Sequence, residues 1–166
     1  MREHPAFVLE RTFNAPRDLV WKAWTDPDML QKWQVHDLKH IHHAVDVSPG
    51  GLWLLEIEQD DPAPNYRHRF EFTDVAEPER FTCISSVADT HWNPISPPLI
   101  EGFPRLTRRT VTLEEEGKQT ICRFVEEPAL ASEAEITCFA EAYSKAQPAW
   151  DICMEKLAGT LEGMQA

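Results

Sequence analysis

The sequence concentrates histidine in one short stretch. His36, His40, His42 and His43 lie within eight positions. His36 and His40 have the spacing of one helical face, and His40 and His42 have the spacing of one strand face. Either pair could bind zinc or nickel through imidazole nitrogens. The alternative is an exposed connector, because only Asp37 is nearby to complete a closed site; we favour it and expect no metal and no cofactor.

A second group of polar residues could act inside the fold. Arg11 alternates with Leu9 and Phe13, and His68 alternates with Phe70, so each shares a strand face with apolar side chains. In an apolar cavity, such an arginine or histidine could anchor the carboxylate or hydroxyl of a ligand. Alternatively, Arg11 pairs with a neighbouring glutamate and His68 is an ordinary strand residue.

No motif in the sequence identifies a catalytic centre. The nucleophile elbow, the metalloprotease helix motif, the phosphate-binding loop and the dinucleotide fingerprint are all absent from it. The cysteines, Cys83, Cys122, Cys138 and Cys153, lack paired spacing and are predicted to be free thiols packed as small hydrophobes. We therefore predict no catalytic residues.

The charge of the chain excludes one class of partner. Its 166 residues include 28 acidic and 16 basic side chains, giving a formal charge of −12. Such an excess repels phosphate and disfavours nucleic acids. No apolar stretch approaches the ~20 residues of a membrane span. We expect a single domain over residues 1–166, located in the cytoplasm.

The elements that must position the candidate side chains are those of an α+β fold. Alternating residues predict a strand over 7–13, followed by two short helices, the first with Pro16 in its first turn and the second capped by Asp26. Residues 44–126 have the pattern of an antiparallel meander of six further strands, beginning at 45–47. We expect a sheet of about six to seven strands.

The last segment predicts one long helix. Ser132 and Glu135 have the spacing of a capping box, and apolar residues recur every three or four positions over 136–164. Pro148 predicts a kink or a break near residues 144–148, because proline removes a backbone donor. The curled sheet would surround this helix.

The segment 88–105 is predicted to be a long apolar loop. It holds four of the 13 prolines, and loops of this length in compact domains commonly act as lids or binding segments. Its apolar residues Trp92, Ile95, Leu99 and Phe103 would lie at a cavity mouth, or would form a protein contact patch.

Several motifs together resemble a known family. They are RTFNAP at 11–16, VWKAWTDP at 20–27, Trp33, PGG at 49–51, and Trp150 followed by Leu157. The chain resembles the START-like, helix-grip (SRPBCC) superfamily and, within it, the family named after the activator of the heat-shock chaperone ATPase. The resemblance implies a curved antiparallel sheet around a long C-terminal helix, with two short helices after the first strand.

The same resemblance implies a cavity between the sheet and the helix, whose wall coincides with part of the core. Besides Arg11 and His68, the candidate lining residues are Trp53, Phe72, Phe139, Tyr143, Trp150 and Met154. The implied activity is binding of a hydrophobic or amphipathic small molecule, lipid-like or aromatic, rather than catalysis.

Two other functions stay open. One is a protein-interaction module, which either forms a homodimer through the 88–105 loop or contacts a chaperone. The eukaryotic activator has a further domain that these 166 residues do not include, so we expect the chaperone contact less. The other is a small cyclase-like or hydrolase-like enzyme.

Overall fold

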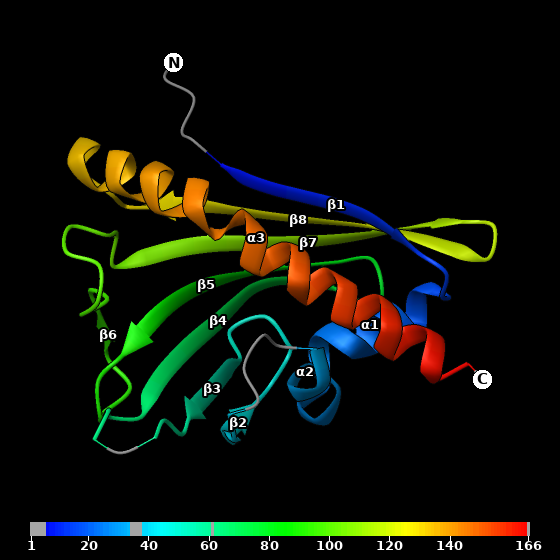
Figure 1. Cartoon of the computed structure of the whole chain (residues 1–166), viewed down its shortest axis with the longest axis horizontal. Coiled ribbons are helices and arrows are strands. Elements are labelled where there is room, and N and C mark those ends of the chain that lie inside the picture. The colour runs from blue at the N-terminus through cyan, green and yellow to red at the C-terminus, as the bar shows by residue number, and fades with distance from the viewer. Residues whose placement is uncertain (1–5, 34–37, 61, 166) are drawn as a thin grey trace.

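One antiparallel sheet, bent around a long helix, makes up most of the molecule (Figure 1). The computed structural model describes residues 6–33, 38–60 and 62–165. The elements are β1 (Phe7–Phe13), α1 (Arg17–Thr25), α2 (Pro27–Trp33), β2 (His40–Val45), β3 (Leu52–Ile57), β4 (Tyr66–Ala76), β5 (Arg80–Ala88), β6 (Pro94–Ile95), β7 (Leu106–Glu116), β8 (Gln119–Ala129) and α3 (Glu133–Gly163). The predicted helix-grip α+β fold is confirmed.

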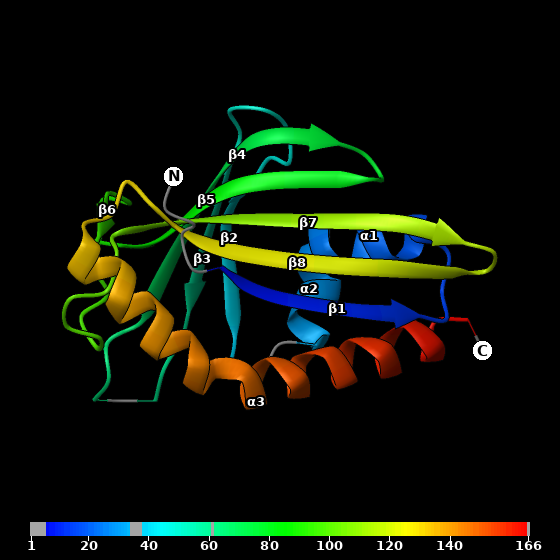
Figure 2. The ribbon, with the colours of Figure 1, turned by 90° about the horizontal axis from the view of Figure 1, so that it is seen from above.

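The sheet runs in the order β1-β8-β7-β5-β4-β3-β2, and β6 pairs with β5. Consecutive strands from β2 to β5 form a meander. The first strand, β1, pairs with the last strand, β8. Figure 2 shows the sheet on one side and α3 on the other, with α1 and α2 beside the C-terminal half of α3.

Helix α3 begins where the sequence predicts. The Ser132 hydroxyl accepts from the Glu135 backbone and the Glu135 side chain accepts from the Ser132 backbone, so the capping box is formed. The predicted break at Pro148 is wrong, since the helix is continuous from Glu133 to Gly163. Its axis nevertheless bends near mid-length (Figure 2), as expected where an internal proline removes a hydrogen bond.

Two parts of the strand assignment need correction. The strand expected at 45–47 is instead β2, His40–Val45, which pairs with β3 from His40 opposite Ile57 onward. The loop 88–105 contains a further two-residue strand, β6, which raises the number of strands to eight. Both are short edge segments, whose few residues show too little alternation to be recognised from the sequence.

A tight turn joins β2 to β3. The Gly51 backbone donates to Ser48 at 2.8 Å. A Cβ placed on Gly51 would lie 2.1 Å from the carbonyl oxygen of Asp46. Only glycine therefore fits this position without displacing the backbone.

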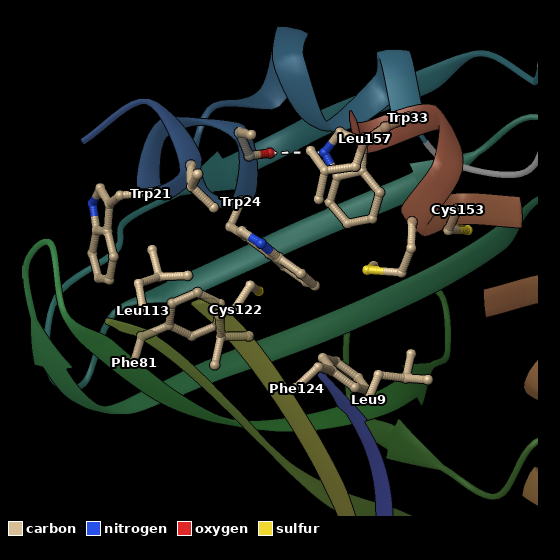
Figure 3. Close-up of a cluster of buried hydrophobic side chains, with 14 of the residues drawn as sticks. Leu9, Trp21, Trp24, Trp33, Phe81, Leu113, Cys122, Phe124, Cys153 and Leu157 are labelled. Carbon is tan, nitrogen blue, oxygen red and sulfur yellow. Dashed lines mark hydrogen bonds between the residues drawn. The ribbon is translucent and has the colours of Figure 1, made fainter. Parts of the chain in front are cut away.

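Large aromatic side chains fill the space between the two short helices and the sheet (Figure 3). Trp33 has no exposed surface and donates its indole N–H to the Ala23 carbonyl at 2.9 Å. The ring of Trp24 stacks on that of Phe124 at 5.8 Å. This core closes one end of the space between sheet and helix, and the cavities described below begin at its edge.

Across the described ranges, no helix combines the length and the apolar composition needed to cross a membrane.

Candidate functional site

Two neighbouring cavities lie between the inner face of the sheet and the helices. The inner cavity has a volume of about 150 Å³ and is lined by Trp24, Leu30, Trp33, Trp53, Leu55, Ile57, His68, Phe70, Phe72, Phe81, Cys83, Arg109, Val111, Phe124 and Trp150. The outer cavity has a volume of about 260 Å³ and is lined by Tyr66, His68, Ser85, Ser86, Val87, Pro97, Ile100, Phe103, Pro104, Arg105, Thr107, Arg109, Glu126, Ala142, Tyr143, Ala146 and Trp150. Both border on His68, Arg109 and Trp150.

The two cavities differ in chemistry. The inner cavity is walled by aromatic and aliphatic side chains, apart from His68, Cys83 and Arg109. The outer cavity has hydroxyl groups and charges, and part of its wall comes from the loop that precedes β7. A molecule that fills both would need an apolar end and a polar middle or head.

A buried ion pair stands where the cavities meet. Arg109 on β7 lies directly opposite Glu126 on β8, and its Nε donates to Glu126 Oε1 at 3.0 Å. Thr107 Oγ1 donates to the same oxygen at 2.8 Å. The Tyr143 hydroxyl of α3 donates to the other carboxylate oxygen. Glu126 is 1% exposed, so the strands and the helix are joined by a fully bonded buried carboxylate.

The electrostatics of the cluster favour the charged form of the Arg109 guanidinium. Burial lowers the pKa of Arg109, but Glu126, Tyr143 and Cys83 together outweigh burial and raise this pKa above the ordinary value. Burial and the Glu126 carboxylate raise the pKa of Tyr143 well above its ordinary range. The guanidinium also lies 5.4 to 5.8 Å from the ring centres of Phe70, Phe124 and Trp150, which is cation–π distance. Arg109 is thus held in place on several sides.

His68 is the neutral member of the site. Its ring stacks on Phe70 at 5.6 Å and contacts Tyr66 at 4.6 Å. Burial, together with the positive charge of Arg109, lowers the pKa of His68 to about 3. Its Nδ1 has no hydrogen-bond partner among the described residues. The ring helps to line both cavities.

The structure brings four of the expected lining residues to the inner cavity: Trp53, His68, Phe72 and Trp150. Tyr143 lines the outer cavity. Phe139 is buried beside Tyr143 and borders a third, shallower pocket between β1 and α3.

The structure does not bring Arg11 or Met154 to either cavity. Met154 is buried in the core. Arg11 pairs with Glu155 of α3 at 2.7 Å, and both side chains are partly exposed to solvent. The arginine of the site is Arg109, not Arg11. Arg11 shares the inner face of the edge strand β1 with Leu9 and Phe13, but it pairs there with Glu155 of α3 and does not reach a cavity.

The loop residues expected at a cavity mouth fall in different places. Phe103 lines the outer cavity and lies 5.9 Å from the Phe139 ring. Ile95 pairs with Val87 in the sheet. Leu99 is 86% exposed and is absent from both cavity linings.

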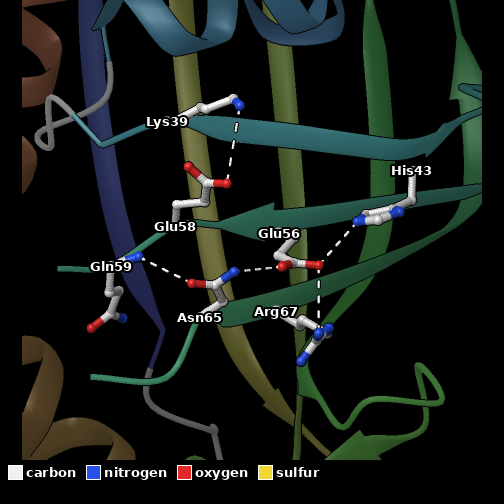
Figure 4. Close-up of polar contacts among 7 residues, drawn as sticks. All are labelled: Lys39, His43, Glu56, Glu58, Gln59, Asn65 and Arg67. Carbon is white, nitrogen blue, oxygen red and sulfur yellow. Dashed lines mark hydrogen bonds and ion pairs between the residues drawn. The ribbon is translucent and has the colours of Figure 1, made fainter. Parts of the chain in front are cut away.

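Trp92 packs against a polar cluster on the outer face of the sheet. Glu56 accepts from His43 at 3.0 Å and from Asn65 at 2.6 Å, and it pairs with Arg67 at 3.5 Å (Figure 4). The Trp92 ring lies 5.2 Å from His43 and 5.9 Å from the Arg67 guanidinium. Its contacts therefore fix the 88–105 loop to β2 and β4.

The histidine stretch is not an exposed connector. His40 is buried, and His42 accepts the indole N–H of Trp53 at 3.0 Å, so residues 40–43 belong to β2 and pack on the sheet. Within the described ranges, no three His, Cys, Asp or Glu side chains are placed to share a metal ion. His36 and Asp37 lie outside the described residues.

Arg109 and Glu126 were not among the lining residues predicted from the sequence. The signal was present, because Arg109 alternates with Val111 and Glu126 alternates with Phe124, and both apolar residues are buried. Strand period alone would have turned the two charges inward.

Comparison with known proteins identifies relatives of the fold. A family model described as "Activator of Hsp90 ATPase homolog 1-like protein" matches residues 14–162. No curated protein matches the chain. Protein Ms6760 from Mycobacterium smegmatis is similar over 96% of this chain and 94% of its own, with a TM-score of 0.73 and 21% identity. A protein from Arthrobacter aurescens is similar over 95% and 86%, with a TM-score of 0.76 and 21% identity. A protein from Staphylococcus epidermidis is similar over 99% of this chain and 93% of its own, with a TM-score of 0.74 and 16% identity.

Proposed function

The chain belongs to the family of activator of Hsp90 ATPase homolog 1-like proteins, and on that premise we propose that it binds an amphipathic small molecule in the inner and outer cavities. The apolar part would occupy the inner cavity. The polar part would lie beside His68 and Arg109. We propose binding without chemical conversion.

The observation that carries this proposal is that an apolar cavity and a polar one share three wall residues, His68, Arg109 and Trp150. A cavity of about 150 Å³ lined by apolar side chains is large enough to hold benzene, and the inner cavity has this volume. The two cavities together reach the lower part of the range of ~300–1,000 Å³ that is usual for small-molecule sites. An apolar wall with a few convergent polar groups is also the usual composition of such sites.

Apolar burial would drive binding, and the polar groups would orient the ligand. Removal of apolar surface from water contributes about 25 cal/mol per Å². Arg109 and Glu126 are already paired, so the site needs little rearrangement to receive a ligand. Such preorganisation lowers the entropic cost of binding.

The same observations argue against catalysis. General acid–base chemistry requires groups that exchange protons near neutral pH. His68 stays neutral because burial and Arg109 lower its pKa to about 3, and Glu126 already accepts from Thr107, Arg109 and Tyr143. His68 is therefore not suited to take up and release a proton at neutral pH, and the carboxylate oxygens of Glu126 are already engaged by three donors.

A titration with a neutral naphthylamine dye, N-phenyl-1-naphthylamine, tests the proposal. We expect saturable fluorescence enhancement with the wild-type protein. Ala146→Trp should abolish it by filling the outer cavity, which Ala146 lines. Ala149→Trp is the matched control, because Ala149 lies on the exposed side of the same helix, and it should bind like wild type. Equal binding by all three proteins, or none by any, would refute the proposal.

A second candidate function is self-association. Leu99, Ile100 and Leu130 are exposed by 86%, 40% and 95%, and α3 approaches the loop where Cys138 Sγ donates to the Glu101 carbonyl at 3.6 Å. Exposed apolar residues at one end of a molecule favour protein contacts. Light scattering at micromolar concentration decides, since a purely monomeric mass would exclude it. No feature of the described residues supports a contact with a chaperone.

We also propose the cytoplasm as the location of this activity. All four cysteines are free thiols, which is usual in reducing compartments. Fractionation of cells, with the protein detected in each compartment, tests this.

A further inference from the structure

We infer that the ligand is a neutral single-ring compound whose hydroxyl group lies between the inner and outer cavities, and that carboxylates are rejected there. This assignment rests on the proposed function and specifies the chemistry of its ligand. It follows from the charges, the unpartnered nitrogen and the size of the inner cavity.

The charges around the meeting point already balance. Arg105, Arg109 and Glu126 are the charged side chains that line the outer cavity, and Arg109 alone among them also lines the inner one. Glu126 neutralises Arg109 at 3.0 Å. Arg105 is exposed, so solvent screens its charge. A carboxylate placed beside Arg109 would therefore be a second buried anion next to Glu126, and burial of an unpaired charge is strongly unfavourable.

A cationic ligand meets the opposite difficulty. The Arg109 guanidinium lies against Phe70, Phe124 and Trp150 on the cavity wall, so an ammonium group in the same place would be repelled by a charge held within the site. A neutral polar group is the one that fits.

His68 specifies which neutral group. Its Nδ1 is buried and has no partner within the described part of the chain, and buried polar atoms are normally satisfied. The neutral imidazole has one N–H and one bare nitrogen. A hydroxyl both donates and accepts, so it can pair with His68 in either tautomer. A ketone or ether could pair only with the N–H.

The inner cavity limits the apolar part. Its volume of about 150 Å³ equals that of an engineered apolar cavity that binds benzene. Its walls include Trp53, Phe72 and Trp150, whose rings can contact the faces and edges of another ring. One aromatic ring with a small substituent fills it, and a second ring would have to extend into the outer cavity.

The experiment compares three ligands of similar shape by calorimetry at about pH 7, where a phenol is neutral and a benzoate is ionised. The ligands are 4-ethylphenol, 4-ethylbenzoate and ethylbenzene. We expect 4-ethylphenol to bind at least roughly tenfold more tightly than either of the others, since one satisfied buried hydrogen bond or one avoided buried charge is enough for this factor.

The outcomes separate this inference from the proposed function. Equal or tighter binding of 4-ethylbenzoate overturns the inference, and so does equal binding of ethylbenzene and 4-ethylphenol, while either result leaves cavity binding intact. If none of the three binds, the proposed function fails as well. Benzoate binding that Arg105→Gln removes would place the anion at the mouth and would also overturn the inference.

Two variants test the assigned contacts. Glu126→Gln leaves Arg109 without its counter-charge, so 4-ethylbenzoate should gain at least roughly tenfold relative to 4-ethylphenol. His68→Phe keeps the ring stacked on Phe70 but removes the polar nitrogens, so 4-ethylphenol should lose its advantage over ethylbenzene. Unchanged ligand preference in both folded variants contradicts the assignment, and the wild-type comparison decides it if either variant fails to fold.

Discussion

Replacement of Arg109 by methionine would test whether the cluster at the meeting point of the cavities is a true buried ion pair. Met keeps much of the length and apolar surface of the side chain but removes its charge. Glu126, which is 1% exposed, would then be a buried carboxylate with only Thr107 and Tyr143 as donors. Breaking a buried pair by removing one partner costs about 3–5 kcal/mol. We expect a loss near 3 kcal/mol at pH 7, because the two hydroxyl donors remain.

Urea unfolding followed by tryptophan fluorescence measures this loss, as the shift of the midpoint at constant slope. The double variant Arg109→Met/Glu126→Gln should recover most of the loss at pH 7, since no isolated charge is left.

The neighbouring residue provides a matched control. Arg108 pairs with Glu127 at 3.3 Å, and its side chain is 47% exposed. Exposed pairs of this kind contribute about 0–1 kcal/mol, so Arg108→Met should have little effect. If Arg109→Met costs less than about 1 kcal/mol, the interpretation of a buried pair is refuted.

Further predictions concern the other parts of the account. The pKa of His68 is about 3 in the folded state against an ordinary value of 6.5, so the stability that its neutral form provides is complete above about pH 6.5 and is lost as the pH falls toward 3. Between pH 7 and pH 5, wild type should lose on the order of 2 kcal/mol more than His68→Phe in urea unfolding. Phe103→Ala should weaken dye binding several-fold, whereas Trp92→Ala, on the outer face, should leave the dissociation constant unchanged in the same fluorescence titration. Gly51→Ala should lower the melting temperature measured by calorimetry, because the added Cβ has no room. Gly159→Ala, in open helical surroundings, should stabilise the protein by about 1 kcal/mol. The reverse order of the two melting temperatures would contradict the packing described.

Much of the fold could be predicted from local patterns. The alternation in residues 7–13 and the capping box at Ser132 and Glu135 specify an edge strand and a helix start, and both form. The strand β2 could not be predicted, because its inward positions are His40 and His42 rather than apolar residues. Pro148 predicted a kink or a break, and the helix bends but continues through it (Figure 2). Contacts on both sides of the proline, those of Tyr143 with Phe7 and of Trp150 with Phe124, hold the helix together across it.

The site was predictable in its aromatic part and not in its charged part. Trp53, Phe72 and Trp150 have helical or strand periods that turn them toward the core, and each lines the inner cavity. Strand period places Arg109 and Glu126 on the inward faces of their strands, but it does not say that the two side chains pair. Cross-strand pairing decides, and pairing is a property of the whole sheet. The 88–105 loop has no period, so nothing in the sequence separates Phe103 from Trp92.

Titration of the six tryptophan indole N–H signals by NMR with 4-ethylphenol tests the central claim most directly. Trp24, Trp33, Trp53 and Trp150 line the inner cavity, whereas Trp21 and Trp92 line neither cavity. Binding in the cavities predicts saturable shifts for Trp53 and Trp150, with one common dissociation constant, and no shift for Trp21 or Trp92. Shifts that do not saturate, or that are as large for Trp21 and Trp92 as for Trp53 and Trp150, would contradict it.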